Sequence, residues 1–217
     1  MNKPFSGKLA VMLVAGVLTN QAQGHGYVSN PPARSFLCRQ GVNTGCGAIQ
    51  YEPQSLEGPS GFPTGGPADG RIASAGLNQF GELDEQTYSR WGKQTLSAGI
   101  RNFTWTLTAN HVTRNWRYYI TRWDWNPNQK LARSAFESMP FCVVDGRLQQ
   151  PALTVTHPCK VPPRMGYQVI LSVWEIGDTS NSFYSVIDAD FGGGGTSPPA
   201  TTTWEPKGTI YPSVDLV

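Results

Sequence analysis

The clearest pattern in the chain is an alternation of apolar and polar side chains over residues 102–109. The apolar positions are Phe103, Trp105, Leu107 and Ala109, and threonines stand between them. A period of two residues is typical of a β-strand that has one face in the core and one face in solvent. Residues 102–109 are therefore predicted to form a half-buried strand.

Four other segments have strand character. Residues 116–121 and 182–191 are rich in aromatic and β-branched residues, and residues 153–156 are a weaker candidate. Residues 168–176 are apolar on both faces, which predicts a central strand covered on both sides. The alternation assigns three tryptophans to the core: Trp105, Trp116 and Trp174.

Residues 29–100 differ from these segments, because they combine many Gly and Pro residues with little periodicity. They are predicted to form a long irregular region with at most short helical turns. Loops of this length in a compact domain are usually functional. Several short strands with such an insertion predict an all-β fold of the sandwich type.

The chain begins like a secretory leader. Lys3 and Lys8 precede an apolar run over residues 9–18, and Ala22-Gln23-Gly24 has the small-x-small form of a cleavage site. The apolar run is far shorter than the roughly 20 residues needed to cross a bilayer. We therefore expect residues 1–24 to be a signal peptide and the secreted protein to begin at His25.

Charge excludes some partners. Removing Lys3 and Lys8 from the 17 Lys+Arg of the chain leaves 15, which equals the 15 Asp+Glu. Clustered basic charge, the footprint of nucleic-acid binding, is not visible. We expect one globular domain over residues 25–191, a monomer with neither a nucleic-acid nor a membrane partner.

Four cysteines in an exported chain favour disulfides. Of the three possible connectivities, Cys38–Cys46 with Cys142–Cys159 is favoured, because each pair brackets a loop that contains Gly or Pro. Zinc ligation by the four thiols is the alternative, but no Cys-x-x-Cys spacing supports it.

Cleavage before His25 would make this residue a special metal ligand. Its free α-amine and its own ring Nδ1 can chelate one ion, and a second imidazole would complete a three-nitrogen set, which favours Cu(II). His111 follows the strand that ends at Ala109 and is the better partner. His157 lies beside Cys159 and is predicted to be structural. By itself, a terminal histidine only permits such a site.

Four segments, in this order, resemble the bacterial chitin-active lytic polysaccharide monooxygenases, also described as chitin-binding proteins. They are His25-Gly26-Tyr27-Val28, Tyr51-Glu52-Pro53-Gln54-Ser55-Leu56-Glu57-Gly58, Thr108-Ala109-Asn110-His111 and Asp178-Thr179-Ser180-Asn181-Ser182-Phe183-Tyr184. The resemblance runs from His25 to about Phe191. It implies an immunoglobulin-like or fibronectin-III-like β-sandwich with a long loop-rich insertion after the first strand.

The resemblance also implies residue roles at a copper site. His25 and His111 match the two histidines that hold one copper ion, and Phe183 matches an aromatic residue in an axial position. Ala109 matches a small residue on the other axial side, and Glu57 matches a carboxylate near the open copper position. Without the resemblance, Phe183 would be read as core and Glu57 as a solvated charge.

A flat substrate-contacting face is implied as well. Its matching residues are Tyr51, Glu52, Pro53, Asp178 and Asn181. Without the resemblance, Asp178 and Asn181 would be read as turn residues, and Tyr51 as an ordinary loop aromatic.

The implied function is copper-dependent oxidative cleavage of insoluble crystalline chitin at C1, with an external reductant and O2 or H2O2 as co-substrate. Cellulose is the alternative substrate. Non-catalytic chitin binding or adhesion, and copper capture or delivery, are the rival functions. Glycoside hydrolysis needs a pair of carboxylates, and none stands out.

The end of the chain changes in character. Residues 192–203 have the Gly/Pro/Thr composition of a linker. Residues 204–217 carry Trp204, Tyr211, Asp215 and Val217 in a pattern that resembles the opening strands of a small chitin-binding module. We expect a truncated start of such a module, with a strand packed onto the main domain as the alternative.

Overall fold

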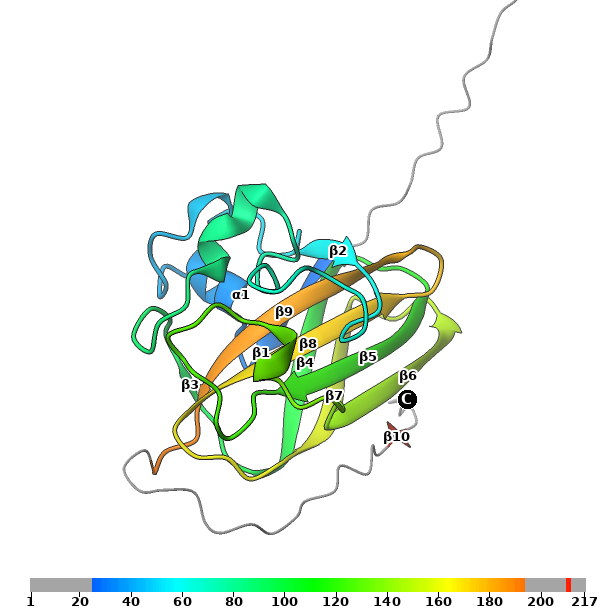
Figure 1. The fold of residues 1–217 in the computed structure, drawn as a ribbon. Helices are drawn as coiled ribbons and strands as arrows, with labels where there is room; N and C mark the ends of the chain where they lie inside the picture. The colour runs from blue at the N-terminus through cyan, green and yellow to red at the C-terminus, as the bar shows by residue number, and fades with distance from the viewer. Residues whose placement is uncertain (1–24, 194–209, 212–217) are drawn as a thin grey trace, which may run out of the picture.

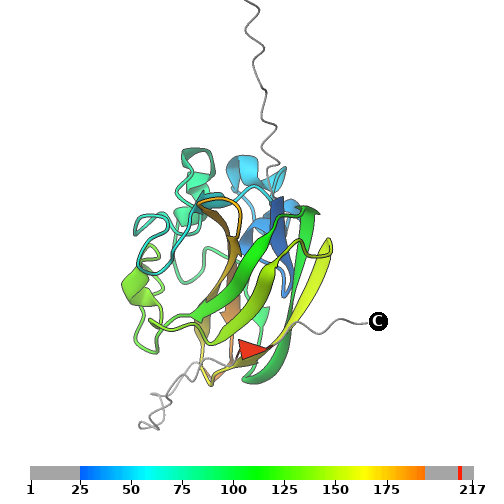
Figure 2. The same cartoon turned by 90° about the vertical axis from the view of Figure 1, so that its right-hand side faces the viewer.

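Two β-sheets pack face to face in the computed structural model, which describes residues 25–193 and 210–211 (Figures 1 and 2). The smaller sheet has the order β1-β4-β7. These strands are β1 (His25–Asn30), β4 (Gly99–Ala109) and β7 (Thr154–Val161). The larger sheet has the order β10-β6-β5-β8-β9-β2, with β3 paired to β9. Its strands are β2 (Glu57–Pro59), β3 (Gln94–Thr95), β5 (Thr113–Ile120), β6 (Cys142–Gln149), β8 (Tyr167–Ile176), β9 (Asn181–Asp190) and β10 (Ile210–Tyr211). The predicted all-β sandwich is confirmed.

The strands predicted from periodicity are present. The alternating segment is the second half of β4, and the segment that is apolar on both faces is β8, in which every residue is buried. β7 extends five residues beyond the weak prediction over residues 153–156, to Val161. No strand was predicted from periodicity over β6, since Asp145-Gly146 interrupts its apolar run.

The insertion between β1 and β4 is largely irregular, as predicted. Its short helices are α1 (Arg34–Arg39) and the 3-10 turns η1 (Gly47–Gln50) and η2 (Asn78–Asp84); η3 (Arg133–Ala135) lies between β5 and β6. No helix within the described residues is long and apolar enough to cross a membrane. Figure 1 shows α1 and the loops of the insertion over the face of β8 and β9.

Each face of the larger sheet therefore borders its own apolar core. Trp105, Trp116 and Trp174 lie in the core between the two sheets, at 0–4 % exposure, as predicted from the alternation. A second core joins the other face of β8 and β9 to the insertion, and its members include Phe62, Phe80 and Trp91. Burial of both faces explains why β8 carries apolar residues on both of its faces.

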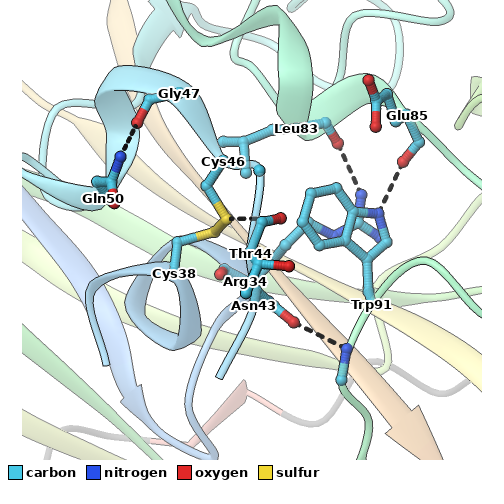
Figure 3. Close-up of a disulfide and its surroundings, with 12 residues drawn as sticks. Arg34, Cys38, Asn43, Thr44, Cys46, Gly47, Gln50, Leu83, Glu85 and Trp91 are labelled. Atoms are coloured by element: carbon cyan, nitrogen blue, oxygen red, sulfur yellow. Dashed lines mark hydrogen bonds between the residues drawn. A yellow bond between two sulfur atoms is a disulfide. The ribbon is translucent and has the colours of Figure 1, made fainter. Parts of the chain in front are cut away.

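A buried ion pair attaches the insertion to the sheet. Arg34, the first residue of α1, donates from Nε and Nη2 to the two carboxylate oxygens of Asp188 on β9, at 2.9 and 2.6 Å. Its Nη1 donates to the carbonyl of Leu83 at 2.8 Å, and Trp91 stacks on the guanidinium (Figure 3). Because a buried charge is costly without a partner, this geometry holds α1 on β9.

The two disulfides are Cys38–Cys46 and Cys142–Cys159, the pairs favoured from the sequence. The first closes the loop between α1 and η1 (Figure 3). The second joins the start of β6 in the larger sheet to β7 in the smaller sheet. No cysteine of the described residues is free, so the chain has no thiolate set for zinc.

His157 is a core residue. Its Nδ1 lies 2.7 Å from the hydroxyl of Tyr118, and its ring lies against Trp116. Burial lowers the pKa of His157 from 6.5 to about 4. This environment agrees with the structural role predicted for it.

The pKa of His157 makes the fold sensitive to acid. A folded-state pKa below the unfolded value gives stability that is complete above pH 6.5 and is lost as the pH falls toward 4. The difference between the two pKa values corresponds to about 3 kcal/mol in the free energy of unfolding. His157→Asn keeps a hydrogen-bonding group for Tyr118 but does not titrate. Between pH 7 and 4.5, its free energy of unfolding, measured with urea, should fall by about 2–3 kcal/mol less than that of the parent. Equal losses in the two proteins would show that His157 does not control acid stability.

Most of the predicted tail and all of the predicted signal peptide lie outside the described residues. Within the tail, Ile210 and Tyr211 form β10, which pairs in parallel with Val143 and Val144 of β6. This pairing corresponds to the alternative given for the tail, in which a strand packs onto the main domain. The truncated module over residues 204–217 stays a prediction.

Candidate metal centre

Strand pairing brings His25 close to the segment that carries His111. His25 is the first residue of β1 and pairs with Ala109, the last residue of β4. His111 follows two residues later, before β5 begins. The Thr108 hydroxyl donates to the His25 carbonyl oxygen at 3.4 Å. The antiparallel register therefore places both predicted ligands at one end of the sandwich.

Gly26 shows why a small residue follows His25. A Cβ at this position would lie 2.6 Å from Leu107 Cδ2 and 3.3 Å from the Trp174 ring. The Gly26 N–H donates to the carbonyl of Gln54 at 3.1 Å, which ties β1 to the loop that follows Tyr51. Core packing and this hydrogen bond fix the backbone beside His25.

The ring of His111 is oriented by a carboxylate. His111 is buried, and its Nδ1 lies 3.3 and 3.4 Å from the two carboxylate oxygens of Asp178. Its carbonyl accepts a hydrogen bond from the Thr113 hydroxyl at 3.0 Å, and Trp174 Nε1 donates to that hydroxyl oxygen at 2.8 Å. Because Asp178 occupies Nδ1, Nε2 is the nitrogen of His111 available to a metal, the usual arrangement of a histidine ligand with a carboxylate behind it.

Phe183 and Glu57 lie side by side on neighbouring strands. The Phe183 ring centroid is 6.3 Å from that of His25, and its side chain is fully buried against Trp174. Glu57 pairs with Phe183 in the register of β2 and β9. The Asn181 amide donates to Glu57 Oε1 at 2.9 Å. A buried apolar ring and a hydrogen-bonded carboxylate thus come from the same strand pair.

The proposed substrate residues differ in exposure. Tyr51, just after η1, is 77 % exposed. Glu52 and Asn181 are partly exposed, and the Asp178 side chain is 45 % exposed. Pro53 is buried, so it supports the loop from within and does not share the surface of Tyr51. The tyrosine ring is therefore the main apolar surface that this loop offers.

The side chains alone do not complete a metal site. Within the described residues, no group of three or more His, Cys, Asp or Glu side chains is placed to hold an ion. Two imidazoles and the α-amine of a chain that begins at His25 would supply three nitrogens, a donor set that suits Cu(II). The residues present therefore fit copper once the chain begins at His25.

Sequence reasoning did not assign the residues behind the two histidines to the site; it placed Trp174 in the core. Gln54, Thr113 and Trp174 act through a backbone carbonyl, a hydroxyl and an indole N–H. None of these types marks a metal site by itself. For Gln54 the only signal was its place inside one of the four matching segments.

The chain is similar to known proteins over most of its length. The family model described as "Lytic polysaccharide mono-oxygenase, cellulose-degrading" matches residues 25–189. The chain is 53 % identical over 209 residues to GlcNAc-binding protein A of Shewanella oneidensis, and 51 % identical over 220 residues to that of Photobacterium profundum. Each match covers 96 % of this chain but only 43 % and 44 % of the relative, so the chain spans less than half the length of these curated relatives.

Solved structures show the same relationship. A lytic polysaccharide monooxygenase from Photorhabdus luminescens is 48 % identical with a TM-score of 0.76, and the match covers 77 % of this chain and 99 % of that one. A Bacillus amyloliquefaciens CBM33 protein, solved in complex with Cu(I) after photoreduction, is 42 % identical with a TM-score of 0.71 over the same shares. With its fold, its paired histidine segments and these matches, the chain belongs to the lytic polysaccharide monooxygenase family.

Proposed function

We propose that this protein is a secreted, copper-dependent monooxygenase that cleaves crystalline chitin oxidatively at C1. The main support is the strand register that pairs His25 of β1 with Ala109 of β4, two residues before His111. The Nδ1 atom of His111 lies against the Asp178 carboxylate. The α-amine and ring of His25 and Nε2 of His111 would hold the ion. Bound copper would supply one-electron redox chemistry, with an external reductant and O2 or H2O2 as co-substrates.

The chain's own residues would prepare the site for this chemistry. The buried ring of Phe183, whose centroid is 6.3 Å from that of His25, offers no ligand atom and would keep water away from a metal held by His25. The Glu57 carboxylate, held by Asn181 at 2.9 Å, can orient a polar co-substrate and move a proton. The Asp178 carboxylate, 3.3 Å from Nδ1 of His111, can accept a hydrogen bond from that nitrogen and would so leave Nε2 for a metal.

Chitin is favoured over cellulose by the exposed loop. The ring of Tyr51 can stack on a sugar face, and the partly exposed carboxylates of Glu52 and Asp178 can accept hydrogen bonds from acetamide N–H groups, which cellulose lacks. The relatives named GlcNAc-binding protein A point the same way. The family description names cellulose, so cellulose is the substrate against which chitin is tested.

Non-catalytic binding is the second candidate function, because the curated relatives are named for binding. Adhesion to a polysaccharide needs no metal, and it would not require His111 to be oriented by Asp178. The proposal of catalysis therefore depends on the two histidines.

The test is product analysis. The full chain, exported with its own leader and loaded with copper, should release soluble oligosaccharides from β-chitin in the presence of ascorbate. Mass spectrometry should show aldonic acids, each carrying one more oxygen atom than the native oligosaccharide. Reactions without ascorbate, and reactions with cellulose, are the controls. Absence of oxidised products from both polysaccharides would leave binding as the function.

A further inference from the structure

β6 carries an unusual bulge at the end nearest His111. Asn115 of β5 pairs with Asp145 of β6, and the next pair is Thr113 with Gln149. Residues 146–148 of β6 therefore stand against the single residue Arg114 of β5. We call residues 146–148 the β6 bulge.

The backbone of the bulge is strained. Arg147 and Leu148 have φ angles of 52° and 53°, the left-handed region that residues other than Gly, Asn and Asp adopt only at a cost. Two such residues in succession need support from their surroundings, and such strain tends to accumulate at functional sites.

Several contacts fix the bulge beside the segment that carries His111. A Cβ on Gly146 would lie 2.4 Å from the Thr113 carbonyl oxygen, so the strands touch closely there. The Arg147 N–H donates to Asp145 Oδ1 at 2.9 Å. After the bulge, Gln150 Nε2 donates to the carbonyl and side-chain oxygens of Asn110, at 3.1 and 2.8 Å. The exit of the bulge is thus bonded to the neighbour of His111.

Leu148 projects from the bulge with 59 % of its surface exposed. Its Cδ2 lies over Gly177: a Cβ on that glycine would be 2.9 Å from Leu148 Cδ2 and 3.0 Å from Val112 Cγ1. Gly177 precedes Asp178, its N–H donates to the Val112 carbonyl at 2.7 Å, and Val112 follows His111. Leu148 therefore lies beside Gly177 and Val112, the chain neighbours of Asp178 and His111.

We propose that Leu148 is a specificity-determining residue that extends the substrate face and packs on the acetamido methyl groups of chitin. This inference rests on the proposed function. An aliphatic side chain cannot stack as a tyrosine ring does, but it gains by covering a methyl group, because removing apolar surface from water is favourable. Cellulose presents hydroxyl groups at the same positions and offers no such contact.

The experiment compares three variants of the exported, copper-loaded chain in binding isotherms on β-chitin and cellulose. Leu148→Asn tolerates the left-handed backbone but removes the apolar surface, and Leu148→Met keeps it. Ile100→Asn is the matched control, because Ile100 is 54 % exposed at the opposite end of β4. Leu148→Asn should weaken chitin binding about threefold to tenfold and leave cellulose binding unchanged, while Leu148→Met and Ile100→Asn should bind chitin like the parent.

Three binding results would overturn the inference. They are unchanged chitin binding in Leu148→Asn, an equal loss in Leu148→Met, and an equal loss on cellulose. The Cu(II) resonance spectrum and melting temperature should match the parent; a changed spectrum would show that Leu148 supports the metal centre and does not contact substrate. If the parent itself neither binds chitin nor releases oxidised products from it, the proposed function fails first. If the parent binds and cleaves chitin but Leu148→Asn binds chitin like the parent, the inference fails alone.

Discussion

A protein with one extra residue ahead of His25 is expected to bind Cu(II) more than about a hundredfold more weakly than the processed protein. Loss of an outer-shell partner alone typically costs about 10–100-fold in metal affinity, and the extra residue removes a ligand. It converts the α-amine into an amide and opens the chelate that His25 would form. No third side-chain ligand lies within the described residues to replace the amine. Isothermal titration calorimetry measures the loss.

The matched control is the same extended protein after proteolytic removal of the added residue. Its affinity for Cu(II) should return to that of the processed chain, since the rest of β1 is unchanged. Equal affinities before and after removal would take the amine of His25 out of the site and leave the two imidazoles without a third nitrogen.

His111→Ala is expected to abolish oxidised products from chitin while much of the chitin binding remains. The change removes an imidazole that sits beside the paired His25–Ala109 ends of β1 and β4, whereas Tyr51, Glu52 and Asn181 keep their place on the surface. His111 is buried, so the melting temperature of the variant must be measured with its products. A variant that still releases aldonic acids would exclude His111 as a ligand.

Tyr51→Ala should give the opposite pattern. Removing the 77 % exposed ring should weaken chitin binding about tenfold, since aromatic contacts add to the area that they bury, and turnover should fall only as binding falls. Tyr88→Ala is the control: Tyr88 is 56 % exposed and contacts Tyr167, at the opposite end of β8 from the His111 side. Equal losses in the two variants would mean that Tyr51 has no special role on the substrate face.

Local pattern by itself determined much of this protein. The alternation over residues 102–109 indicated a half-buried strand and the apolar run over 168–176 a central strand, because side-chain period and burial are local properties of a strand. The cysteine spacing favoured the two disulfides that form. The matching segments around His25 and His111 indicated the family. The sequence does not show the hydrogen bonds and contacts between these matching residues.

Only the tertiary structure decided how those residues meet. The register of β1 on β4 sets His25 against Ala109, and the pairing of β2 with β9 sets Glu57 against Phe183. The contact of Asp178 with His111 depends on packing between segments distant in sequence. The β6 bulge had no sequence signal, because Arg147 and Leu148 are not residues that favour the left-handed region. Their conformation is imposed by Gly146 against Thr113 and by Gln150 against Asn110. Such contacts are long-range, and no local periodicity encodes them.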